Sequence, residues 1–163
     1  MKEKTLEEEV ASLLLSLKIT IAVAESCTGG LICHRLTSIS GSSDYLEMGV
    51  VTYSNRSKID LLEVPGQTIK EHGAVSEACV KAMAMGIKRL AGTDLGLAVS
   101  GIAGPTGGTP DKPVGTVHIA LAWNEDVYCW KYVLNGNRGE IKEQASRKGL
   151  LRIRDLCQSM KNG

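Results

Sequence analysis

The sequence predicts an α/β fold, a three-layer α/β/α sandwich with a mixed, mostly parallel sheet. Two observations lead to this prediction: short apolar, β-branched runs alternate with amphipathic helical segments, and neither an internal repeat nor a long linker interrupts the alternation. The chain has 163 residues, of which 43% are hydrophobic. Because a chain of this length can bury a sufficient core, we expect a single domain over residues 1–163.

Five elements are expected in the first part of the chain, each from its apolar spacing and its flanking turn residues. In chain order they are a helix over 6–17, a strand over 19–24, a helix beginning near Leu31, a buried strand over 48–54 and a short helix over 58–62. The polar turn ESCTGG separates the first strand from the second helix. Pro65 and Gly66 are expected to end the short helix.

Six further segments are expected in the second part of the chain, beginning with a helix that Ser76 is placed to cap. They are a helix over 77–90, a strand over 94–100, a loop over 101–113, paired strands over 114–123 and 127–134, and a helix over 138–160. The loop holds four glycines and three prolines, a composition that excludes a helix or a central strand.

Three loops are expected near the carboxyl ends of the strands, where ligands bind in sheets of this kind. They are ESCTGG after the first strand, YSNRSK at the end of the second and SGIAGPTGG after the third. We therefore expect the functional site where these three loops meet.

The first loop offers a row of nucleophiles, Ser26, Cys27 and Thr28, followed by Gly29 and Gly30. The glycines let a ligand approach the main chain, and free N–H groups at the start of a helix favour an anion or a developing oxyanion. The simpler interpretation is that Ser26 or Thr28 only caps the helix. A thiol near a helix N-terminus can have a lowered pKa, so the residues alone do not rank Ser26 above Cys27.

A serine nucleophile needs a base, and Lys58 in TYSNRSK is the candidate, because no histidine lies in a recognisable pattern and no GxSxG elbow occurs. An ordinary lysine has a pKa of ~10.4, so Lys58 must lose roughly three units, an effect of about 4 kcal/mol from burial or from a cation such as Arg56. Tyr53 is placed to orient the amine or to carry its proton. The alternative is a solvated lysine at the start of a helix.

Glycines in the third loop, Gly101 and Gly104 among them, are typical of a phosphate-binding loop but also suit a plain turn. Neither GxxxxGK[ST] nor GxGxxG occurs, so the sequence supports neither an ATP P-loop nor a dinucleotide fingerprint. Arg138, at the start of the last helix, is either a fork for a phosphate or carboxylate or a surface residue.

Composition excludes several partners. Nineteen Lys and Arg against 18 Asp and Glu leave a net charge of +1, and aromatic residues make up only 4%, so we expect no nucleic-acid partner. The chain shows no apolar run of ~18 residues, no secretory leader and no CxxC pair among five cysteines, which predicts a cytoplasmic protein without a membrane partner. Cys27, Cys33 and His34 lack the spacing of a zinc site, so no metal is expected.

Five blocks of the sequence resemble the CinA C-terminal domain family, in order and over almost the whole chain: AESCTGG, GSSDYLEMGVVTYSNRSK, HGAVSE, SGIAGPTGG and KPVGTVHIA. The resemblance implies a nicotinamide mononucleotide deamidase of the pyridine nucleotide cycle, an amidohydrolase that forms nicotinate mononucleotide and ammonia without a cofactor. It implies that Ser26 is the nucleophile, Lys58 the base and Tyr53 the associated tyrosine.

The residues of the three loops suggest how this substrate is held. Main-chain N–H groups of Thr28, Gly29 and Gly30 are expected to bind the oxyanion, and Gly101, Gly104 and Arg138 the ribose phosphate. The family carries a GDR-type motif before its last helix, whereas this chain has Asn137 in place of the acid and Lys142 where a second arginine is common.

The resemblance also implies a stand-alone form of the domain and a homo-oligomer, most simply a dimer. The departures at Asn137 and Lys142 keep one alternative open. In that alternative the chain is a non-catalytic module that binds nucleotides or a partner on the same scaffold.

Overall fold

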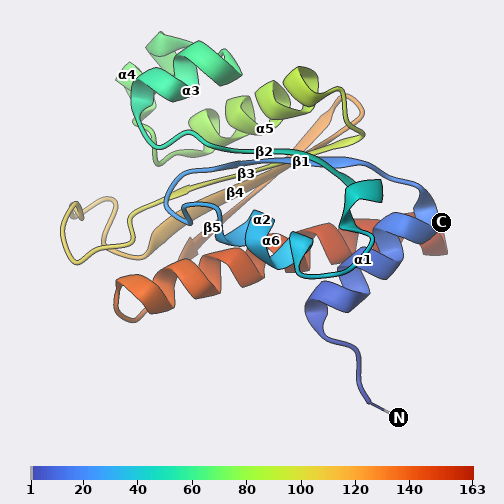
Figure 1. The fold of residues 1–163 in the computed structure, drawn as a ribbon. Helices are drawn as coiled ribbons and strands as arrows, with labels where there is room; N and C mark the ends of the chain where they lie inside the picture. Colours follow the sequence, from blue (N-terminus) through green and yellow to red (C-terminus); the bar gives the residue numbers. More distant parts are fainter. Residues whose placement is uncertain (1) are drawn as a thin grey trace.

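The computed structural model describes residues 2–163 and confirms the predicted α/β architecture. The strands are β1 (Ile21–Glu25), β2 (Leu46–Val51), β3 (Leu95–Gly101), β4 (Thr116–Trp123) and β5 (Asp126–Val133). The helices are α1 (Leu6–Leu17), α2 (Leu31–Thr37), α3 (Asn55–Leu62), α4 (Gly66–His72), α5 (Glu77–Ala91) and α6 (Arg138–Asn162), with a 3-10 helix η1 (Ser42–Asp44). Figure 1 shows α3, α4 and α5 on one face of the sheet and α1, α2 and α6 on the other.

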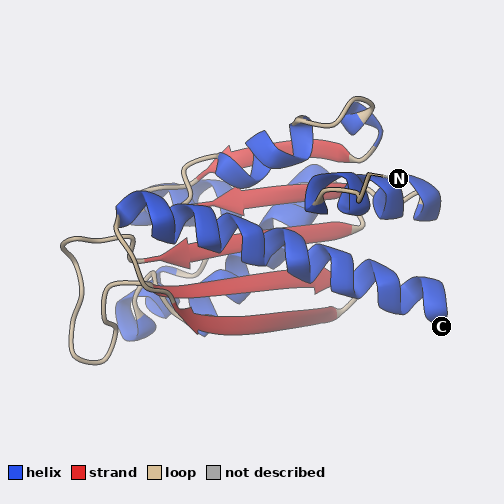
Figure 2. Cartoon of the chain, turned by 90° about the horizontal axis from the view of Figure 1, so that it is seen from below, coloured by secondary structure: helices blue, strands red, loops and turns tan. Residues whose placement is uncertain are grey.

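The sheet is mixed, with strand order β2-β1-β3-β4-β5. β1 pairs in parallel with β2 and β3, whereas β4 pairs antiparallel with β3 and β5. β4 alone therefore runs against the other four strands, and the mostly parallel sheet is confirmed (Figure 2). The carboxyl ends of β1, β2 and β3 lie at the same edge, which brings the three predicted loops together.

Two apolar cores fill the spaces between the sheet and its helices. The central strands β1 and β3 are buried on both faces, with Val23 and Leu97 in the core beneath α1, α2 and α6. The opposite face carries alanines under α5, and a Cβ on Gly96 would overlap the carbonyl oxygen of Ala84 in that helix. α5 therefore packs directly on the strands, because small residues allow the close approach.

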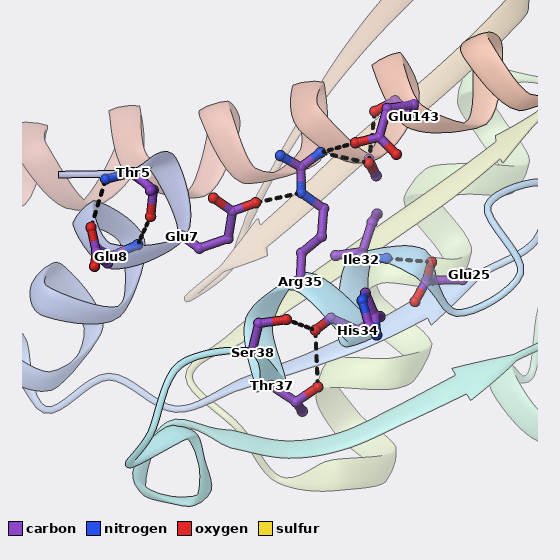
Figure 3. A network of polar contacts seen from close by, with 11 residues as sticks. Thr5, Glu7, Glu8, Glu25, Ile32, His34, Arg35, Thr37, Ser38 and Glu143 are labelled. Atoms are coloured by element: carbon purple, nitrogen blue, oxygen red, sulfur yellow. Dashed lines mark hydrogen bonds and ion pairs between the residues drawn. The ribbon is translucent and has the colours of Figure 1, made fainter. Parts of the chain in front are cut away.

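A polar network holds α1, α2 and α6 together outside the apolar core. Arg35 Nε donates to Glu7 Oε1 at 2.7 Å, and Arg35 Nη1 donates to Ser146 Oγ at 2.8 Å and to Glu143 Oε1 at 3.3 Å (Figure 3). The guanidinium fork lets one side chain of α2 contact both neighbouring helices. This fixes the position of α2, the helix that follows the ESCTGG turn.

Two sequence expectations need correction. The strand expected to be buried over 48–54 is β2, which ends at Val51 and lies at the edge of the sheet with alternate residues exposed. Its apolar run resembles a central strand, but no strand pairs with its outer side in residues 2–163. α3 ends at Leu62 with the left-handed Glu63 as its C-cap, two residues before Pro65. Pro65 and Gly66 instead begin α4, which we did not expect because we assigned both residues only to the end of a helix, whereas proline also suits a helix start.

Candidate functional site

The loops that follow β1, β2 and β3 meet the start of α6 around a cavity of about 190 Å³. The cavity is lined by six residues that the sequence had singled out: Ser26, Cys27, Tyr53, Lys58, Gly101 and Arg138. Asn55, Ser100 and Ala103 also line it and were not singled out from the sequence. Segments that are far apart in the sequence therefore share one depression at the carboxyl edge of the sheet, as expected for such folds.

Lys58 and Ser26 are in direct contact. Lys58 Nζ donates to Ser26 Oγ at 3.1 Å, and its other partners are the carbonyl oxygens of Thr52 at 2.6 Å and Tyr53 at 3.3 Å. Ser54 caps α3 by accepting a hydrogen bond from the Ser57 N–H, which places Lys58 in the first turn of the helix. The lysine is not solvated, since only 1% of its surface is exposed.

Burial lowers the pKa of Lys58 below its ordinary value, since a desolvated ammonium is disfavoured. The suggested help from Arg56 is absent: that side chain is 89% exposed and pairs with Asp60 at 3.1 Å. Burial alone therefore supplies the downward shift in the pKa of Lys58, and the neighbouring Cys27 and Cys79 oppose it.

The protonation state of Lys58 decides whether its amine donates to Ser26 or accepts from it. A neutral amine has two N–H donors and one lone pair, whereas an ammonium has three donors and no acceptor. If the carbonyls of Thr52 and Tyr53 take two N–H groups, a neutral Lys58 directs its lone pair at the hydroxyl of Ser26. The geometry thus suits transfer of the Ser26 proton to Lys58.

Cys27, the competing nucleophile, is buried, and burial raises the pKa of its thiol to about 12. A lowered thiol pKa at the helix N-terminus was the reason to consider Cys27, and the structure shows the opposite shift. Cys27 Sγ packs against β3, 3.1 Å from the position that a Cβ on Gly101 would take. The thiol is therefore protonated near neutral pH and is a poor nucleophile.

We expected free N–H groups at the N-terminus of α2, but the fully buried carboxylate of Glu25 caps them. Its carboxylate accepts a hydrogen bond from the Gly30 N–H at 3.2 Å. It also accepts one from the Ile32 N–H at 3.0 Å (Figure 3). The Gly29 N–H donates to the Ser26 carbonyl oxygen at 3.1 Å. Gly29 and Gly30 therefore do not offer the oxyanion donors that we expected, and sequence reasoning missed that the neighbouring acid would take them.

Tyr53 contributes to the site with two separate groups. Its carbonyl oxygen contacts Lys58, whereas its side chain is 61% exposed and its hydroxyl accepts from Arg138 Nη2 at 3.1 Å. Arg138 Nη1 donates to the Gly104 carbonyl oxygen at 2.7 Å. Arg138 therefore joins the tyrosine to the glycine-rich loop at the rim of the cavity. The role of the phenol as a proton carrier stays a prediction.

Gly101 and Gly104 are glycine for steric reasons. A Cβ on Gly101 would lie 2.7 Å from Val117 Cγ2, and Gly104 has a φ of +78°, which other residues rarely adopt. Gly104 directs a carbonyl oxygen, not an N–H group, to its partner in the site. Lys142, one turn beyond Arg138 on α6, places its Nζ 3.6 Å from the Cβ position of Gly29. Two cations of α6 thus flank the site.

The described residues contain no cluster of three His, Cys, Asp or Glu side chains suited to a metal ion. Within residues 2–163, no helix has both the length and the apolar character to cross a membrane. The five cysteines are all free thiols.

The fold and this contact define a class: three-layer α/β domains that hold a buried serine–lysine pair at the carboxyl edge of the sheet. The family model of the CinA C-terminal domain matches residues 3–157. The chain belongs to the CinA C-terminal domain family.

Relatives of known sequence and structure agree with this assignment. The chain is 55% identical over 153 residues to a CinA-like protein of Syntrophus aciditrophicus, covering 93% of this chain and 36% of that protein. It is 61% identical over 122 residues to a CinA-like protein of Desulfosudis oleivorans, covering 75% of this chain and 30% of that protein. The chain thus spans about a third of the length of these curated relatives.

Solved structures share the fold along the whole domain. A CinA superfamily protein from Klebsiella pneumoniae superposes with a TM-score of 0.91 at 34% identity, covering 94% of this chain and 96% of that chain. A competence/damage inducible protein from Agrobacterium tumefaciens superposes with a TM-score of 0.87 at 37% identity, covering 96% of this chain and 99% of that chain. The predicted fold class is therefore confirmed independently.

Proposed function

We propose that this chain is an amidohydrolase that converts nicotinamide mononucleotide to nicotinate mononucleotide and ammonia. The observation that carries the proposal is the contact between Ser26 Oγ and the buried Lys58 amine at 3.1 Å. A lysine with a lowered pKa next to a serine is a recognised way to activate a nucleophile. The choice of substrate rests on the sequence resemblance.

In the first step, Ser26 Oγ attacks the carboxamide carbon while its proton moves to Lys58 Nζ. The carbon–nitrogen bond then breaks, and the proton on Lys58 passes to the departing nitrogen, which leaves as ammonia. Water attacks the acyl-enzyme, gives a proton to Lys58 and releases the acid, and Lys58 returns that proton to Ser26. Each proton taken up by Lys58 is therefore given back within the cycle.

The tetrahedral oxyanion needs donors that the protein does not already use. Among residues 2–163, the main-chain N–H groups of Cys27 and Thr28 donate to no other residue, although the Cys27 N–H faces its own thiol. Both lie directly after Ser26, where an oxyanion formed on its ester would be near. We assign the oxyanion to these two N–H groups, each of which typically supplies about 3–4 kcal/mol of transition-state stabilisation.

The cavity is smaller than the roughly 300–1,000 Å³ of a typical ligand pocket. It therefore suits the carboxamide-bearing ring, and the ribose phosphate lies at the rim. Arg138 lines the cavity and Lys142 lies next to Gly29, so both offer a cation to the phosphate, with the loop at Gly101 and Gly104 alongside. A homo-oligomeric state, a single domain and a cytoplasmic location remain predictions.

Ammonia release from nicotinamide mononucleotide tests the proposal. We expect Ser26→Ala to lower turnover by at least about 10³-fold, because the nucleophile is lost. Cys27→Ala keeps the main-chain N–H and should lower turnover by less than about tenfold. The opposite ranking would identify a thiol enzyme.

A second assay tests the alternative of a binding module. Binding of the nucleotide without ammonia release, at enzyme concentrations comparable to substrate, would refute hydrolysis and favour that alternative. The departures at Asn137 and Lys142 motivate it.

A further inference from the structure

We propose that Glu25 is a positioning residue whose buried carboxylate fixes the turn that carries Ser26, and so holds the hydroxyl of Ser26 on Lys58. This inference rests on the proposed function, since it assumes that Ser26 is the nucleophile. Glu25 does not line the cavity and is 0% exposed. It therefore acts on the reaction only through the residues that it holds.

Four donors converge on the two carboxylate oxygens of Glu25. Oε1 accepts from Thr28 Oγ1 at 2.5 Å, from the Gly30 N–H at 3.2 Å and from the Ile32 N–H at 3.0 Å. Oε2 accepts from the Cys33 N–H at 3.0 Å. An ionised carboxylate is an acceptor only and has room for about four donors, so this side chain is fully used.

Glu25 replaces the side chain that normally caps a helix. The residue at the N-cap of α2 is Gly30, which has no side chain to accept the first N–H groups. The carboxylate of Glu25, five residues earlier, accepts from that cap and from the first turn instead. The start of α2 is therefore tied to the end of β1.

The main chain of Glu25 ties the same turn to the neighbouring strands. The Glu25 carbonyl oxygen accepts from the Thr52 N–H at 2.9 Å, and the Ser26 N–H donates to the Val99 carbonyl oxygen at 3.1 Å. The carbonyl oxygen of Thr52 in turn accepts from Lys58 at 2.6 Å. Glu25 thus connects the turn that carries Ser26 with Thr52, whose carbonyl oxygen orients the amine of Lys58.

The turn needs such a restraint because its backbone is permissive. Gly29 and Gly30 have φ values of +61° and +103°, and glycine loses more conformational freedom on ordering than other residues. Ser26 lies between the strand and these glycines. Without the carboxylate, the turn would keep its bonds to the strands and its main-chain bonds from Gly29 to Ser26 and from Leu31 to Thr28, but it would lose its tie to the first turn of α2. A shift of about 1 Å at a reacting group can lower a rate roughly 100-fold.

Glu25→Gln tests the inference, because glutamine keeps the size of the side chain but turns an NH₂ group toward donors that need an acceptor. We expect kcat for ammonia release to fall roughly 10- to 100-fold, with KM changed by less than about threefold. The matched control is Tyr45→Phe, which removes a buried hydrogen bond from Tyr45 to the Leu36 carbonyl oxygen at the far end of the same helix. It should lower stability and leave kcat within about twofold.

A milder pair of variants covers the case in which Glu25→Gln does not fold. Thr28→Val removes one donor to the carboxylate, and Thr28→Ser keeps the hydroxyl. We expect Thr28→Val to lower kcat roughly 3- to 10-fold and Thr28→Ser to recover most of that loss. Equal kcat values for Thr28→Val, Thr28→Ser and wild type would overturn the inference.

Covalent labelling of Ser26 by a fluorophosphonate, followed by intact-mass spectrometry, separates this inference from the proposed function. Labelling of wild type without ammonia release refutes the proposed substrate, and slower labelling of Glu25→Gln then still supports the positioning role. If folded Glu25→Gln is labelled and turns over substrate at the wild-type rates, the positioning role is refuted and the proposed function stands. If wild type neither labels nor releases ammonia, Ser26 is not an activated nucleophile and both proposals fall.

Discussion

Replacement of Lys58 by methionine tests whether the buried amine loses its proton at a lower pH than an ordinary lysine does. Methionine fills similar space but has no titratable group, and Lys58 is only 1% exposed. Burial lowers the pKa of Lys58 in the folded protein, whereas the unfolded chain keeps the ordinary lysine value of ~10.4. Between these two pKa values the unfolded state binds one more proton than the folded state. The free energy of unfolding of the wild type must therefore rise with pH across that window.

One proton corresponds to a slope of about 1.4 kcal/mol per pH unit, and Lys58→Met lacks this contribution. Below the lowered pKa the wild type bears the whole cost of a charged buried amine, and above the ordinary lysine pKa of ~10.4 it bears none. The variant also leaves the carbonyl oxygens of Thr52 and Tyr53 without a donor, at about 1–3 kcal/mol each. That loss does not depend on pH, so it shifts the curve without changing its slope.

Urea unfolding of both proteins, in steps from about pH 6 to about pH 10, measures the difference directly. All other titrating groups are shared, so the difference between the two curves isolates Lys58. Wild-type kcat/KM should rise with pH through the same lowered pKa and then level off, because only the neutral amine accepts the proton of Ser26. Parallel stability curves would refute the buried, deprotonated amine, and a rate that falls over this range would refute its role as a base.

Three further variants test the rim of the site and the core. Arg138→Ala should raise KM for nicotinamide mononucleotide by roughly 10-fold or more, since it removes a charged fork, and an unchanged KM would place the phosphate elsewhere. Tyr53→Phe removes only the hydroxyl that faces Arg138 and should lower kcat/KM by less than about tenfold; a loss near that of Ser26→Ala would make the phenol a proton carrier. Tyr45→Phe should lower the free energy of unfolding by about 1–2 kcal/mol in urea titrations, and an equal stability would show that its buried hydrogen bond contributes nothing.

Local patterns in the sequence were sufficient for most of the fold. The apolar spacing over 6–17 predicted α1 within its observed bounds, and Ser76 was correctly expected to cap α5. The glycines and prolines of residues 101–113 correctly predicted a loop between β3 and β4. Periodicity and capping act within a few residues, so a single sequence contains them.

The tertiary structure decided which groups of the site have a partner. Ser26 and Lys58 are 32 residues apart, and Tyr53 and Arg138 are 85 apart, so only the packing of the strands brings each pair into contact. Burial of Lys58 and capture of the α2 N–H groups by Glu25 likewise depend on surroundings that no local pattern describes. By itself the sequence determined the elements and the candidate residues, because these follow from side-chain periodicity and chemical type. Desolvation and long-range hydrogen bonds set the chemical state of those residues, and both exist only once the chain has folded.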